Sequence, residues 1–130
     1  MSDAKLFDTK NAFSGMSVDN IDAAREFYSG TLGLEVVTNE MGFLEVHLET
    51  GGIILIYGKP DHEPASFTVL NFAVPDIDEA VDALNAAGIK TKIYEDGLPT
   101  DSKGIMRGNG PDIAWFKDPA GNVLSVLTTV

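Results

Sequence analysis

Glu45 and His47 are the pair of side chains whose types and spacing best suit acid–base or metal chemistry in this sequence. One residue separates them, so on a β-strand both point to the same face. There they can hold a divalent ion or pass a proton. The apolar residues that alternate with them are typical of a half-exposed strand, and we favour that structural interpretation. His62, the other histidine, lies between two acidic residues in a proline-containing segment, and we expect it to be solvated.

Ser125 is a lone hydroxyl in an apolar segment. It follows the turn residues Asp118 to Gly121 in a stretch that predicts a strand, and it shares one strand face with Val123 and Leu127. No glycines flank it in the pattern of a nucleophile elbow, which argues against a serine hydrolase built on Ser125. The chain has no cysteine, so thiolate nucleophiles, thiolate metal sites and disulfides are excluded.

The composition limits the class of protein. A chain of 130 residues, 44% hydrophobic and 22% charged, predicts one globular domain. The formal net charge of −11 argues against nucleic acid and anionic membranes as partners, and it suits either simple solubility or a cationic ligand. No apolar run is long enough to cross a bilayer and nothing marks export, so the cytoplasm is the expected location.

The chain contains an internal repeat, which sets the expected fold. Residues 16–36 resemble residues 72–91, and residues 51–58 resemble residues 121–127. Repeated segments in the same order indicate two copies of one structural unit. We therefore interpret the single domain as two modules.

Each module shows the same order of elements: a strand, a helix and three further strands. Module 1 covers about residues 11–58, a linker covers 59–66, and module 2 covers about 67–130. We expect an α+β fold of two βαβββ modules, with two helix-backed sheets paired as a mixed sheet that encloses a cleft. The expected strands lie at 13–18, 34–39, 41–49, 53–58, 67–74, 89–95, 112–117 and 122–128.

The sheet faces that point away from the helices are mostly apolar, with a few polar points. That composition suits a small-molecule cleft, and it equally suits a plain sheet-on-sheet core. Trp115 and Phe116 are neighbours on one strand, so one is expected in the core and the other in the cleft. The other residues expected on this face are Phe13, Gly15, Leu55, Tyr57, Val69, Asn71, Ser125 and Leu127.

Residues 94–112 form a long segment rich in Gly, Pro and Asp. Ile105 and Met106 give this segment apolar side chains to bury, so we expect it to be ordered beside the cleft. Met106 and Arg107 are then directed toward a ligand. The glycines of the segment lack the strand–turn–helix context of a phosphate-binding loop.

Three segments resemble the vicinal oxygen chelate superfamily, namely residues 13–36 (FSGMSVDNIDAAREFYSGTLGLEV), 67–90 and 115–127 (WFKDPAGNVLSVL). That superfamily includes glyoxalase I, extradiol dioxygenases, fosfomycin resistance enzymes and the bleomycin resistance proteins. The resemblance covers nearly the whole chain and implies a fold of two βαβββ modules. It does not imply one activity, because one fold hosts many functions.

Enzymes of this superfamily hold a divalent ion at four strand positions that usually carry His, Glu or Gln. The resemblance assigns these positions to Phe13, Leu55, Val69 and Ser125. None of these side chains is a usual metal ligand. The resemblance therefore implies neither a metal site of the family type nor another cofactor, and we assign no catalytic residue. Ser125 then stands where a carboxylate is missing.

Three functions remain open on the sequence. The first is a metal-free protein similar to the bleomycin resistance proteins, which holds an apolar or cationic small molecule in its cleft and forms a homodimer. The second is a glyoxalase-type lyase or isomerase with a non-standard site, for which Glu45, His47 and Arg107 are the first candidates. The third is a structural or interaction module without a ligand. The expected cleft lining is Phe13, Leu55, Tyr57, Val69, Asn71, Met106, Arg107, Trp115, Phe116 and Ser125.

Overall fold

The computed structural model describes residues 5–94, 98–108 and 110–128, and these form two modules of the same design. The elements of module 1 are β1 (Ser14–Val18), α1 (Ile21–Arg25), the π-helical turn η1 (Glu26–Thr31), β2 (Glu35–Thr38), β3 (Leu44–His47) and β4 (Ile53–Gly58). The elements of module 2 are β5 (Thr68–Val74), α2 (Ile77–Ala86), β6 (Ile105–Met106), β7 (Ile113–Lys117) and β8 (Val123–Thr128).

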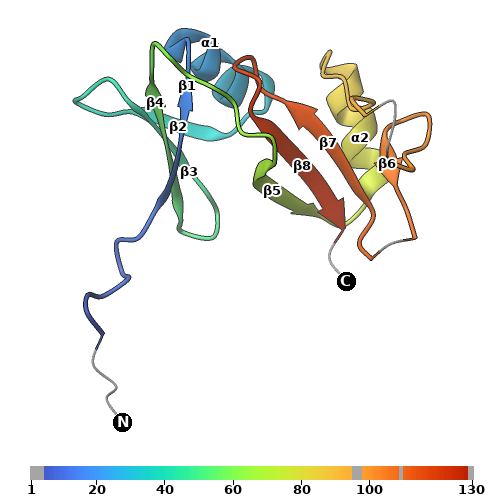
Figure 1. Ribbon diagram of the computed structural model, residues 1–130, viewed down its shortest axis with the longest axis horizontal. Coiled ribbons are helices and arrows are strands. Elements are labelled where there is room, and N and C mark those ends of the chain that lie inside the picture. The colour runs from blue at the N-terminus through green and yellow to red at the C-terminus, as the bar shows by residue number, and fades with distance from the viewer. Residues whose placement is uncertain (1–4, 95–97, 109, 129–130) are drawn as a thin grey trace.

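The strands form two four-stranded mixed sheets, which lie side by side in Figure 1. The strand order is β1–β4–β3–β2 in the first sheet and β5–β8–β7–β6 in the second. In each sheet the first strand pairs in parallel with the last, and the other pairs are antiparallel. The α+β fold of two βαβββ modules, expected from the repeat, is confirmed.

Side-chain caps start both helices. The Asn20 side chain accepts a hydrogen bond from the Ala23 amide at 3.0 Å, and the Asp76 side chain accepts one from the Glu79 amide at 3.1 Å. Such caps satisfy amide groups that have no partner inside the helix. Neither helix, nor any other in the described part of the chain, is long and apolar enough to cross a bilayer.

The hydrophobic core lies between the helices and the sheet faces that they cover. Alternation along each strand sends one set of side chains into this core, as in β3, where Leu44 and Val46 are fully buried and the residues between them are not. Phe116 from β7 and Tyr28 from η1 are the largest fully buried side chains. The remaining core includes Met16, Val18, Ile56, Leu70, Val81, Leu124 and Val126.

The second strand of module 2 differs from the expectation. Residues 89–94 form no strand, and the edge strand is instead β6, whose Ile105 pairs with Ala114 of β7. Thr91 is buried nonetheless, and its hydroxyl is satisfied by a hydrogen bond that it donates to the Lys103 carbonyl at 2.7 Å. Gly104 permits this close approach, since a Cβ atom there would lie 2.1 Å from the Thr91 carbonyl oxygen. The apolar alternation at 89–93 therefore reflects packing against a loop rather than strand pairing.

Polar side chains join the two modules. The Tyr28 hydroxyl of module 1 donates to Oδ2 of Asp118 in module 2 at 2.7 Å, and both residues are buried. Asn122 donates from Nδ2 to the Ser17 carbonyl at 2.9 Å and to Asp118 Oδ2 at 3.0 Å. Burial raises the pKa of Tyr28, and the negative charge of Asp118 raises it further, so the phenol keeps its proton and donates.

His62 also bridges the modules, which corrects the expectation of a solvated side chain. Its Nδ1 lies 2.6 Å from the Ser17 hydroxyl, and its Nε2 lies 3.0 Å from the Ala120 carbonyl. The linker that carries His62 is therefore tied to β1 and to the β7–β8 turn. The two contacts span 45 and 58 residues of sequence, so local composition gave no signal for them.

Candidate ligand-binding site

The open face of each sheet, defined here as the face that points away from the helix, carries the residues expected to line a cleft. In the first sheet, Gly15 lies opposite Leu55, and Leu55 lies opposite Glu45. Opposed residues in neighbouring strands share a face. Phe13 comes two residues before Gly15 on the same side, so Phe13, Leu55 and Glu45 all belong to the open face of the first sheet.

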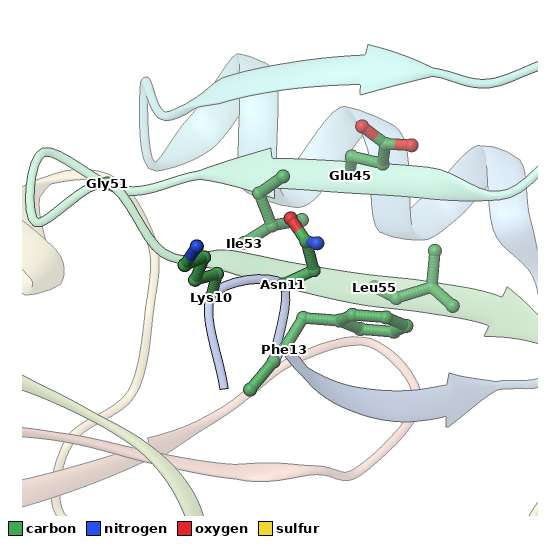
Figure 2. Close-up of a pocket in the computed structure, with 8 residues that line it drawn as sticks. Lys10, Asn11, Phe13, Glu45, Gly51, Ile53 and Leu55 are labelled. Atoms are coloured by element: carbon green, nitrogen blue, oxygen red, sulfur yellow. The ribbon is translucent and has the colours of Figure 1, made fainter. Parts of the chain in front are cut away.

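A cavity of about 410 Å3 lies on this open face. Figure 2 shows its floor on β3 and β4 and a wall formed by the chain that leads into β1. Phe13 and Leu55 supply apolar surface, and the Phe13 side chain is 64% exposed. The full lining is Lys10, Asn11, Ala12, Phe13, Glu45, Gly51, Ile53 and Leu55.

Glu45 is the acidic group of this cavity. Its Oε1 lies 3.2 Å from Nε2 of His47, and its Oε2 accepts a hydrogen bond from Nδ2 of Asn39 at 3.4 Å. Both members of the Glu45–His47 pair are about one-third exposed, as expected for a half-exposed strand. They lie on one face, as their spacing predicted. In the described part of the chain, no group of three or more His, Cys, Asp or Glu side chains could hold a metal ion.

The open face of the second sheet carries a polar pair, of which Ser125 is covered and Asn71 is exposed. Ser125 is fully buried, and its hydroxyl donates to Oδ1 of Asn71 at 2.5 Å. Trp115 lies opposite Ser125 in the β7–β8 pair, and its Nε1 donates to the Thr68 hydroxyl at 3.1 Å. Since Thr68 is on β5, the indole crosses β8 and covers Ser125. The Tyr94 ring packs edge-on against the indole at 5.3 Å between ring centres.

The remaining expected lining residues lie at separate points of the open faces. Tyr57 packs against Phe43 on the first sheet, with 6.2 Å between the ring centres. Val69 lines a different cavity, of about 370 Å3, between β1 and the start of β5. Met106 lies opposite Ile113 at the outer edge of the second sheet. Within one chain, therefore, the expected lining falls into two groups, one on each sheet.

Two expected lining residues lie elsewhere. Phe116 pairs with Leu124 on the helix side of the second sheet and is part of the core, which leaves Trp115 as the residue on the open face. Arg107 is directed to α2 instead of a ligand, because it forms ion pairs with Asp78 at 2.8 Å, Asp101 at 3.4 Å and Asp112 at 3.7 Å. The hydrogen bond from Arg107 lowers the pKa of Asp78 below its usual value, and Lys103 adds to this effect.

Sequence reasoning missed five lining residues of the 410 Å3 cavity, namely Lys10, Asn11, Ala12, Gly51 and Ile53. Ile53 alternates with Leu55 on β4, and that spacing was sufficient to find it. Lys10 and Asn11 precede β1 in a polar segment without periodicity, which gave no signal for a cavity wall.

Comparison with known families supports the resemblance seen in the sequence. The profile of the Glyoxalase/Bleomycin resistance protein/Dioxygenase superfamily matches residues 12–126. The chain belongs to this superfamily. Comparison with curated protein sequences gives no match.

Solved structures of the superfamily share the fold of this chain. An antibiotic binding protein, TnmS3 from Streptomyces sp. CB03234, is 20% identical with a TM-score of 0.71, over 98% of this chain and 100% of that chain. The fosfomycin resistance protein FosX from Listeria monocytogenes is 12% identical with a TM-score of 0.67, over 92% of both chains. A glyoxalase family protein from Enterococcus faecalis is 25% identical with a TM-score of 0.61, over 88% of this chain and 94% of that chain.

The four positions that the resemblance assigns to metal binding do not fit a divalent ion. Phe13, Leu55 and Val69 carry no donor atom. The hydroxyl of Ser125 is fully buried and already bonded to Asn71. Metal ligands are deprotonated or lone-pair donors held around an open coordination position, and none of the four positions offers that arrangement.

Proposed function

We propose that this protein binds an apolar small molecule without a metal ion, in the manner of the bleomycin resistance branch of its superfamily. The observation that carries the proposal is the cavity of about 410 Å3 on the first sheet, built around Phe13 and Leu55, two of the four positions that hold metal in the family's enzymes. Apolar side chains at these positions can contact a ligand directly, where the family's enzymes coordinate an ion. Apolar cavities of this size with a few polar groups suit small ligands.

Of the two charged side chains that line the cavity, Lys10 and Glu45, Glu45 lies over the strand floor and favours a ligand with a cationic group. Glu45 presents a partly exposed carboxylate to the cavity beside the apolar floor. The Phe13 ring lies in the same cavity and can attract a cation through its π face. The net charge of −11 adds a field that concentrates cations near the surface.

The first test is titration with ethidium, a planar aromatic cation, and with anilinonaphthalene sulfonate, an aromatic anion. We expect ethidium to bind more tightly and to raise the melting temperature, because a ligand that binds only the folded state stabilises it. Glu45→Gln should weaken ethidium binding about two- to fivefold, from roughly 0.5–1 kcal/mol for a partly exposed ion pair. Phe13→Ala should weaken it about tenfold through lost contact and cation–π attraction.

A matched control separates a local effect from a change in net charge. Glu79→Gln removes the same charge from an exposed position on α2, and it should leave ethidium binding unchanged. Equal binding by the wild type and by Glu45→Gln and Phe13→Ala would contradict the site. Retention of about one equivalent of offered nickel, zinc or manganese per chain after dialysis would contradict the metal-free part of the proposal.

We also propose that the binding unit is a homodimer. Phe13 and Val37 lie on the same open face of the first sheet with 64% and 45% of their surface exposed, and apolar residues that gather on one exposed face mark an interaction surface. A second copy related by a two-fold axis can cover this face with the open face of its own second sheet, and so unite the two groups of lining residues.

Sedimentation equilibrium tests the homodimer directly. The wild type should sediment as a dimer, and Val37→Ser should shift the equilibrium toward monomer. Met41→Ser is the control, because Met41 is also exposed but lies in the β2–β3 turn. A wild type that stays monomeric at a protein concentration of about 100 μM would contradict the homodimer.

A further inference from the structure

We propose that Ser17 is a nucleophile activated by His62, and that the cavity between β1 and β5 accepts a small ester with an apolar acyl group. Ser17 lies on β1 and is one of the residues that line this cavity of about 370 Å3. The site is separate from the ligand cavity around Phe13 and does not depend on the function proposed above.

The hydrogen bonds of His62 fix the tautomer that a general base needs. A carbonyl oxygen only accepts hydrogen bonds, so the 3.0 Å contact with the Ala120 carbonyl requires the proton on Nε2. Nδ1 of the neutral ring then carries a lone pair, and it lies 2.6 Å from the Ser17 hydroxyl. This arrangement of nucleophile, base and orienting acceptor is the one that activates serine in acyl transfer.

The backbone of β1 supplies one donor, the Ser17 amide, for the negative oxygen that forms during attack. The Val18 carbonyl accepts from the Lys59 amide, which follows β4, whereas the Ser17 carbonyl accepts from Asn122 across the module junction. The N–H and C=O groups of one strand residue point to the same edge, so the Ser17 amide also points away from β4. β1 is an edge strand, and within the described ranges no strand of its sheet pairs with that side. The Ser17 amide therefore faces the cavity edge as an oxyanion donor.

The cavity lining indicates the class of ester. Phe67 and Val69 offer apolar surface for an acyl chain, and Glu63 adds a carboxylate that disfavours anionic substrates. In the first step the Ser17 Oγ–acyl bond forms, the ester C–O bond breaks, and the Oγ proton passes through His62 Nδ1 to the leaving alcohol oxygen. Water then attacks acyl-Ser17 by the same proton path and releases the carboxylic acid.

A single introduced thiol gives a sharp test, because the chain has no cysteine. Ser17→Cys places a thiol beside His62, and Ser14→Cys is the control, since Ser14 lines the same cavity and is more exposed. With iodoacetamide we expect Ser17→Cys to react at least tenfold faster, because an adjacent imidazole favours the thiolate. The excess should disappear when His62→Gln is added, since glutamine can still donate to the Ala120 carbonyl but is not a base.

The native serine is tested with p-nitrophenyl acetate, followed by intact-mass analysis and peptide mapping. The wild type should gain one acetyl group, on Ser17, and the Ser17→Ala variant should gain none. The melting temperatures of both proteins verify that they are folded. Equal alkylation rates for Ser17→Cys and Ser14→Cys would overturn the proposal, as would acetylation that persists in Ser17→Ala. In either case the Ser17–His62 hydrogen bond serves only to join the modules.

Discussion

Replacement of Tyr28 by phenylalanine tests whether a polar contact, in addition to the apolar core, holds the two modules together. The substitution keeps the buried ring and removes the hydroxyl, which donates to Asp118 Oδ2 at 2.7 Å and also lies 3.8 Å from Met16 Sδ. A hydrogen bond to a charged acceptor contributes about 1.5–3 kcal/mol. Asp118 keeps its bonds from the Ala120 and Asn122 amides and from Asn122 Nδ2, so it is not left unpaired.

The expected loss converts to a change in melting temperature. Unfolding entropy is about 2.1 cal/mol/K per residue near 60 °C, or roughly 0.27 kcal/mol/K for a chain of this length. A loss of about 1.5–3 kcal/mol therefore lowers the melting temperature of Tyr28→Phe by about 5–11 °C. Calorimetry and urea unfolding should agree if unfolding is two-state.

Tyr57→Phe is the matched control, because Tyr57 lies half-buried on an open face and its hydroxyl has no hydrogen bond among the described residues. It should change stability by less than about 0.5 kcal/mol. If Tyr28→Phe and Tyr57→Phe melt at the same temperature, the hydrogen bond between Tyr28 and Asp118 does not stabilise the fold, and the reasoning is refuted.

The pH dependence gives this prediction an independent check. Burial raises the folded-state pKa of Tyr28, and Asp118 raises it further, so the folded state binds the phenolic proton more tightly than the unfolded state. A raised folded pKa contributes stability that is complete below the unfolded pKa, about 10 for tyrosine, and that is lost as the pH rises above it. The stability difference between the wild type and Tyr28→Phe should therefore be constant below about pH 9 and shrink above pH 10.

Two further substitutions test local features of the fold. Gly104→Ala should lower the free energy of unfolding by well over the roughly 1–2 kcal/mol of a positive φ alone, because its Cβ would clash with the Thr91 carbonyl. Gly42→Ala, also at positive φ but with open space around it, should lower it by only about 1–2 kcal/mol, as measured by urea unfolding. Asp78→Asn should destabilise the protein at neutral pH, because the hydrogen bond from Arg107 lowers the pKa of Asp78. A lowered folded pKa gives stability that is present above the unfolded pKa and lost as the pH falls through the folded pKa. The variant and the wild type should therefore converge in melting temperature as the pH falls below 3.8, the ordinary value of an aspartate, and also in high salt.

Sequence periodicity was sufficient to predict the modules but not the side on which every residue lies. Strand alternation predicts that Trp115 and Phe116 occupy opposite faces, yet it cannot say which face the helix covers. The structure decides this through Leu124, a core residue that pairs with Phe116. Likewise, Ile89 and Thr91 are buried at alternate positions, as in a strand, but a loop satisfies Thr91, and β6 pairs with β7 in its place.

The candidate site was predicted where it depends on one strand and missed where it depends on contacts between distant segments. Glu45 and His47 share a face because their spacing requires it. Lys10 reaches the same cavity from the chain before β1, where no pattern marks it. Arg107 looked like a ligand contact because a basic residue in a long loop often is one. Its partner Asp78 lies 29 residues away, beyond the reach of any periodic signal.

The junction between the modules determines how the two open faces are presented, and polar residues make its specific contacts. Among the described residues, no strand of one sheet pairs with a strand of the other, so strand pairing does not set the relative placement of the two sheets. Polar side chains supply the directional contacts instead, and each is satisfied by a partner from another segment. They are Tyr28, Asp118, Asn122, Ser17 and His62. The buried members of this set, Tyr28, Asp118 and Asn122, are costly when unpaired, which penalises other arrangements of the modules. Apolar periodicity thus forms each module, and a small set of polar residues fixes how the modules meet.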